Sequence, residues 1–142
     1  MQDNAITVKT TVDATPKEAW HYYTESEHVV NWNFASEDWH CAVAKNDLSV
    51  GGEFLIKMTS KQGNMSFDLE GTYDEIDANN HIVYTLENGR KVSVDFAEKG
   101  ESTEVTVSFD PDQEQSTDHQ REGWQAILDN FNKYVNTLEK TS

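Results

Sequence analysis

The sequence has little cysteine and little positive charge, and each shortage excludes a class of structure or partner. Cys41 is the single cysteine among 142 residues, which excludes an internal disulfide and any metal site built from several thiolates. The 11 lysines and arginines are scattered among 26 aspartates and glutamates, which leaves a net charge of −15 and no concentrated basic surface. We therefore expect neither a nucleic-acid partner nor a membrane partner, and the acidity indicates solubility.

Long apolar runs are also missing. No run of about 18 apolar residues, the length that spans a bilayer, occurs in the chain. Residues 1–7 have neither the basic nor the apolar region of a secretory signal. We therefore expect a cytoplasmic protein. The length of 142 residues fits a single domain, residues 1–142, present as a monomer or a homodimer.

The most informative pattern that is present is an apolar stripe near the C-terminus. Apolar residues recur at steps of three and four over residues 117–138, which predicts one long amphipathic helix. Thr117 and Gln120 have the spacing of a cap at its start. The stripe consists of Trp124, Ile127, Leu128, Phe131, Tyr134, Val135 and Leu138.

Alternating apolar and polar residues predict about six to seven antiparallel strands before that helix. After the first strand, Thr15-Pro16-Lys17-Glu18 has the form of a capping box and predicts a short helix. Ser26 begins a second short helix. The strands are expected at residues 6–12, 39–44, 54–59, 67–74, 82–86, 92–96 and 105–109.

This order of elements predicts an α+β protein with a curved antiparallel sheet wrapped around the C-terminal helix. Gly71 lies inside a strand and predicts a bulge or a sharp bend, as a curved sheet needs. Gly51-Gly52 permits a positive φ or a close backbone approach in a turn. A curved sheet that holds one long helix tends to leave a cavity between the two, and function is expected there.

Four short motifs then point to a known superfamily. They are TP-xx-AW…W at residues 15–32, DLSVGGEF at 47–54, EGTYDEI at 70–76 and GW…L at 123–128. In this order they resemble the helix-grip, START-like fold of the birch-pollen-allergen superfamily, in the branch similar to the C-terminal domain of the activator of heat-shock protein 90 ATPase. The resemblance implies a cavity between helix and sheet, and it implies no fixed chemistry.

The sequence contains few groupings suited to catalysis or metal binding. His21, His28, His40, His81 and His119 form no i, i+4 pair within one predicted helix, and no HExxH or CxxC spacing occurs. His40 and Cys41 are adjacent on a strand, so their side chains point to opposite faces and cannot form a nucleophile pair. We therefore expect no metal, no cofactor and a buried, unreactive Cys41. The sequence favours a binding protein over an enzyme.

Aromatic side chains carry the prediction of a site. Most are expected in the core, but some are predicted to line the cavity, where tyrosine and tryptophan add polar groups to an apolar wall. Asn33 is a further polar candidate near the mouth. The predicted ligand-binding residues are Trp32, Phe54, Met58, Phe67, Tyr73, Tyr84, Trp124, Leu128, Phe131 and His40.

Three functions follow from these observations. The favoured one is a binding module that holds a small apolar or amphipathic molecule under the C-terminal helix. The second, a cochaperone-like regulator of a heat-shock ATPase, is implied by the resemblance alone. The third is an enzyme of the cyclase or hydrolase kind found elsewhere in this fold, for which His40 and Tyr84 are the candidate acid–base residues.

Overall fold

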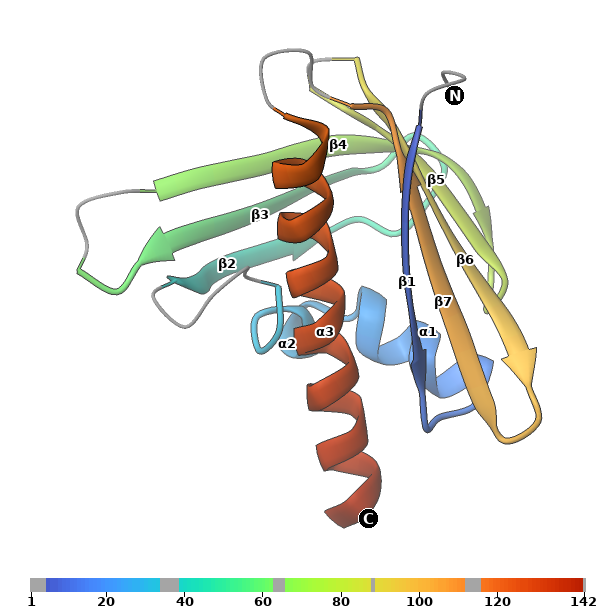
Figure 1. The fold of residues 1–142 in the computed structure, drawn as a ribbon. Coiled ribbons are helices and arrows are strands. Elements are labelled where there is room, and N and C mark those ends of the chain that lie inside the picture. The colour runs from blue at the N-terminus through green and yellow to red at the C-terminus, as the bar shows by residue number, and fades with distance from the viewer. Residues whose placement is uncertain (1–4, 34–38, 63–65, 88, 112–115, 142) are drawn as a thin grey trace.

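The computed structural model describes residues 5–33, 39–62, 66–87, 89–111 and 116–141. Within these ranges the chain forms one seven-stranded sheet and three helices, which confirms the predicted α+β class (Figure 1). None of the described helices is both long and apolar enough to cross a membrane. The elements are β1 (Ile6–Val12), α1 (Pro16–Thr24), α2 (Ser26–Val29), β2 (Trp39–Asn46), β3 (Glu53–Ser60), β4 (Ser66–Asp77), β5 (His81–Leu86), β6 (Lys91–Lys99), β7 (Ser102–Phe109) and α3 (Thr117–Thr141).

The strand order is β1-β7-β6-β5-β4-β3-β2, and all neighbours are antiparallel. The first strand thus pairs with the last, and α1 and α2 carry the chain across to β2 at the opposite edge. The sheet curls strongly, and α3 runs across its concave side (Figure 1). This is the helix gripped by a sheet that the sequence predicts.

The curl is helped by two irregular positions in the strand ladders. The register shifts between Cys41 and Val43 in β2, and between Tyr73 and Glu75 in β4. Bulges of this kind increase the local twist of a sheet. Of the two possibilities at Gly71, the bulge is wrong, because Gly71 pairs regularly with Phe54 on one side and with Leu86 on the other.

Glycine is needed at position 71 for space instead. A Cβ there would lie 2.7 Å from Cε1 of Phe54 and 2.8 Å from the backbone oxygen of Thr85, closer than a real Cβ comes. The ring of Phe54 therefore lies over the bare backbone of Gly71. A close approach of this kind is the other common reason for a glycine inside a strand.

The helix starts follow local rules, with one correction. In α1 the Glu18 backbone N–H donates to Thr15 Oγ1 and the Thr15 N–H donates to Glu18 Oε1, both at 3.2 Å, which confirms the capping box. The expected cap of α3 at Thr117 is wrong, since the His119 N–H donates to the Ser116 hydroxyl at 3.1 Å. Serine in the preceding position satisfies the same orphan N–H group.

Several polar side chains of α3 form hydrogen bonds with the backbone of β1 and the residue after it. Gln125 Nε2 donates to the Lys9 carbonyl at 3.1 Å, and Asn132 Nδ2 donates to the Thr11 carbonyl at 2.8 Å. Further along, the Asp13 N–H donates to Asn136 Oδ1 at 3.0 Å. These amides tie α3 to the free edge of β1 and the residue that follows it, so the helix lies close to one edge of the sheet.

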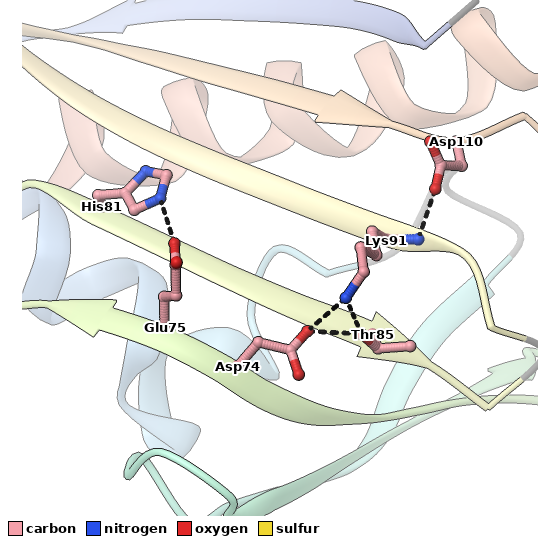
Figure 2. A network of polar contacts seen from close by, with 6 residues as sticks. All are labelled: Asp74, Glu75, His81, Thr85, Lys91 and Asp110. Atoms are coloured by element: carbon pink, nitrogen blue, oxygen red, sulfur yellow. Dashed lines mark hydrogen bonds and ion pairs between the residues drawn. The ribbon is translucent and has the colours of Figure 1, made fainter. Parts of the chain in front are cut away.

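A polar network covers part of the outer surface of β4, β5 and β6 (Figure 2). Lys91 Nζ lies 3.3 Å from Asp74 Oδ2 and 3.0 Å from Thr85 Oγ1. His81 lies between two carboxylates, with Nε2 3.4 Å from Glu75 Oε2 and Nδ1 2.5 Å from Asp95 Oδ1.

This pair of contacts makes the contribution of His81 to stability dependent on pH. Burial alone lowers its pKa, but the hydrogen bonds and charges of Asp95 and Glu75 outweigh burial and raise the pKa above its usual value. The contribution is then fully present below about pH 6.5 and is lost as the pH rises through the raised pKa.

Urea denaturation of the wild-type protein and His81→Gln at several pH values tests this. The pairs are partly exposed and screened, so we expect the wild-type advantage to be about 0.5 kcal/mol at pH 5.5 and to decrease as the pH rises through the raised pKa of His81. An advantage that stays constant or grows with pH would contradict the assignment.

Candidate ligand cavity

A cavity of about 530 Å³ lies between the concave face of the sheet, the α1–α2 segment and the N-terminal half of α3. The backbone of α3 comes close to β1 and α1. Towards β3, β4 and β5 the backbones lie further apart, and only side chains occupy the space between them. Small-molecule sites in proteins have volumes of about 300–1,000 Å³ and mainly apolar walls. The aromatic and aliphatic part of this wall is Tyr23, Val29, Trp32, Trp39, Ala44, Phe54, Ile56, Met58, Leu69, Tyr73, Ile82, Tyr84, Val107, Trp124, Ile127 and Leu128.

The structure brings most of the predicted site residues to this one wall. Phe131 lies behind it instead, fully buried, with its ring centroid 4.8 Å from that of Trp32. His40 is exposed on β2 and is not among the described lining residues, and the side chain of Phe67 lies outside the described part of the chain. Asn33 lines the cavity. The predicted residues in the wall are Trp32, Phe54, Met58, Tyr73, Tyr84, Trp124 and Leu128.

Some lining residues were missed by sequence reasoning. Ile56 could have been found, because it shares a strand face with Phe54 and Met58 in an alternating pattern. Tyr23 had no such signal. It lies in the last turn of the short helix α1, and its place in the wall depends on how α1 crosses the sheet.

A chain of hydrogen bonds crosses one side of the cavity. The Tyr73 hydroxyl donates to Asn46 Oδ1 at 2.6 Å, and Asn46 Nδ2 donates to the Thr24 carbonyl at 2.6 Å. It joins β4, β2 and the end of α1. This chain holds the Tyr73 ring in place and uses its hydroxyl proton.

Two other tyrosines present hydroxyls that are not used in this way. Tyr23 and Tyr84 line the cavity, and neither hydroxyl has a hydrogen-bond partner in the described part of the chain. Burial raises the pKa of Tyr84 well above its usual value and also raises that of Tyr23. Both phenols therefore stay protonated and can donate a hydrogen bond.

The two acid–base candidates are separated in the structure. Tyr84 faces the cavity from β5, whereas His40 is exposed on β2 away from the wall. Cys41, its neighbour in sequence, is buried as expected, and burial raises the pKa of the thiol. The predicted opposition of His40 and Cys41 across the strand is confirmed.

The structure also gathers three groups that the sequence did not pair. Ligand atoms of His21, Glu27 and His28 lie within 4.8 Å of one another, and His28 Nδ1 is 2.7 Å from the Tyr134 hydroxyl oxygen. Sequence reasoning considered pairs within one helix, whereas the extended backbone of Glu25 turns α2 back towards α1. None of the three lines the cavity among the described residues, and the absence of a metal stays a prediction.

Comparison with known proteins agrees with this architecture. The AHSA1-like protein of Aeromonas hydrophila is 32% identical, with a TM-score of 0.87 over 94% of each chain. A protein of Cytophaga hutchinsonii is 41% identical, with a TM-score of 0.81 over 98% of this chain and 96% of that one. A Chromobacterium violaceum protein at 18% identity has a TM-score of 0.84, over 94% and 98% of the two chains, and shows the fold alone.

The sequence itself is matched over most of its length. The family described as "Activator of Hsp90 ATPase homolog 1-like protein" matches residues 13–136, which confirms the resemblance drawn from the four motifs. No curated protein matches the chain. The protein belongs to the Activator of Hsp90 ATPase homolog 1-like family.

Proposed function

We propose that this protein is a binding module that holds a small apolar or amphipathic molecule between its sheet and α3. The observation that carries the proposal is the cavity of about 530 Å³ with a wall made largely of aromatic and aliphatic side chains. Apolar walls with a few placed polar groups are typical of small-molecule sites. The cytoplasmic location and the single domain are part of the proposal and rest on the sequence alone.

A cochaperone-like role is the second candidate, because the family takes its description from a homologue of an activator of the Hsp90 ATPase. Such a role needs a contact surface on the outside of the protein. Val50 is the large hydrophobic side chain with high exposure among the described residues, at 68%. A partner would therefore meet a mostly polar and acidic surface, and co-purification with the ATPase should then weaken steeply with added salt.

Native mass spectrometry tests the favoured function first. The purified protein should carry a mass above 16.2 kDa that is lost on denaturation, and the released molecule would identify the ligand class. Thermal melts with a panel of apolar compounds should show stabilisation of the same protein. A bare mass together with no stabilisation by any compound would contradict the proposal.

Removal of Trp124 should weaken binding. Its ring stacks on Phe109 with centroids 4.2 Å apart and an interplanar angle of 15°, and it also lines the cavity. In Trp124→Leu the ligand loses an aromatic surface worth roughly 1–2 kcal/mol, so we expect Kd to rise about tenfold in titration calorimetry.

Trp20→Leu is the matched control for this variant. Trp20 packs against Phe96 with ring centroids 5.4 Å apart and is not among the described lining residues. Both variants should lose stability, but only Trp124→Leu should lose affinity. Equal affinities in both variants would count against the cavity as the binding site.

A further inference from the structure

We propose that the cavity selects an uncharged apolar molecule with an acceptor oxygen, such as a ketone or ester carbonyl, which the hydroxyls of Tyr84 and Tyr23 bind. This inference rests on the binding function proposed above and names its ligand class. It is carried by two donors without partners in a wall that has no described carboxylate.

Tyr84 is a fixed donor in the middle of the sheet. It is opposite Tyr73 on β4 and Val92 on β6, and its ring packs edge-on against Phe54 with centroids 4.9 Å apart. The residue is only 8% exposed, lines the cavity and has no hydroxyl partner in the described chain. The hydroxyl oxygen is not a fully buried atom, so it is open to the cavity. A ligand oxygen in the cavity can therefore accept its proton in place of water.

Tyr23 brings a second donor from α1. Three rings hold it in place: Trp32, Phe131 and Phe96, at centroid distances of 4.9, 5.2 and 5.6 Å. Its hydroxyl also has no partner in the described residues, and the two phenols interact electrostatically, since Tyr23 contributes to the raised pKa of Tyr84. Tyr73 differs from both, because its proton is already given to Asn46.

The charges around the cavity favour a neutral ligand. The chain has 26 acidic residues, yet no aspartate or glutamate is among the described lining residues, so no carboxylate would receive a cation. Of the basic lining residues, Lys45 and His119 are exposed to water, and Arg90 already interacts within the protein and adds its buried Nε as a further donor of a wall residue. A net charge of −15 opposes the approach of an anion. Neutral phenol donors match a neutral acceptor.

A matched set of naphthalenes tests the inference, since their apolar body is constant. Titration calorimetry would compare 2-ethylnaphthalene, 2-acetylnaphthalene, 2-naphthoate and 2-(aminomethyl)naphthalene. We expect the ketone to bind about tenfold more tightly than the hydrocarbon and more tightly than either ion. In Tyr84→Phe this preference for the ketone over the hydrocarbon should fall to near one, and Tyr23→Phe should reduce it in part.

Tyr134→Phe is the control, because the Tyr134 hydroxyl contacts His28 and is not among the described lining residues. It should keep the ketone preference. Equal binding of ketone and hydrocarbon by the wild-type protein, or a preference that survives in Tyr84→Phe, would overturn the inference and leave the binding function intact. Tighter binding of naphthoate would overturn the choice of a neutral ligand. If none of the four bound, this inference would be overturned, and the native mass together with the thermal melts would decide the binding function separately.

Discussion

Replacing Phe131 with alanine should lower the free energy of unfolding by about 3–5 kcal/mol, the cost typical of a large aromatic removed from a packed core. Phe131 is fully buried on the inner face of α3. Its ring meets Trp32 and Tyr23 edge-on, at centroid distances of 4.8 and 5.2 Å. Alanine would leave a void where α3 rests on the α1–α2 segment, and neighbouring side chains in a close-packed interior fill such voids only in part.

Urea denaturation gives the free energy, and a thermal melt should show a fall in Tm of about 10–15 °C for a chain of this size. Lys133→Ala is the control, because Lys133 is exposed on the same helix. It should change stability by no more than about 0.5 kcal/mol. A loss below about 1 kcal/mol in Phe131→Ala would mean that α3 is not packed as the structure has it.

Replacing Gly52 with alanine should cost about 2–4 kcal/mol, because the backbone cannot accept the added methyl group without moving. A Cβ at Gly52 would lie 2.2 Å from the carbonyl oxygen of Asp47. The shift needed would disturb two backbone hydrogen bonds at this turn, from Gly52 N–H to Ser49 O at 2.8 Å and from Tyr73 N–H to Gly52 O at 2.9 Å. The second of these holds a residue of the cavity wall.

Gly51→Ala is the matched control, since it adds the same methyl group one residue away. Gly51 has a φ of +86°, but nothing lies within 4 Å of its Cβ position. Its substitution therefore carries only the strain of a left-handed backbone, about 1–2 kcal/mol. Chemical denaturation of both variants should show the larger loss in Gly52→Ala. Equal losses would argue against the close approach of Asp47.

This glycine pair illustrates how far a local pattern reaches. The sequence allowed either a positive φ or a close approach at Gly51-Gly52, and the structure assigns the first to Gly51 and the second to Gly52. The same holds for Gly71, where a glycine in a strand suggested a bulge and the cause is the Phe54 ring. The sequence pattern identifies the position that requires glycine. The physical reason for that requirement depends on which atoms lie next to the position in the folded protein.

The candidate site also has a part that the sequence predicts and a part that it does not. Trp32, Phe54, Tyr73, Tyr84 and Trp124 could be predicted from the sequence, because apolar residues on one face of a strand or helix must be covered by something. The sequence could not separate the wall from the layer behind it, and Phe131 belongs to that layer. Hydrophobicity is the same in both, so only packing tells them apart.

The sequence by itself determined the order and type of the elements, the capping box of α1 and the family, because periodicity, capping residues and short motifs are local signals. Only the tertiary structure decided that α3 would lie along β1 through its amides and leave a space towards β3, β4 and β5. It alone brought Tyr23 from α1 and Tyr84 from β5 to one cavity. The curvature of the sheet and the path of α1 and α2 determine which of these side chains come together. Both result from the summed packing of the whole chain.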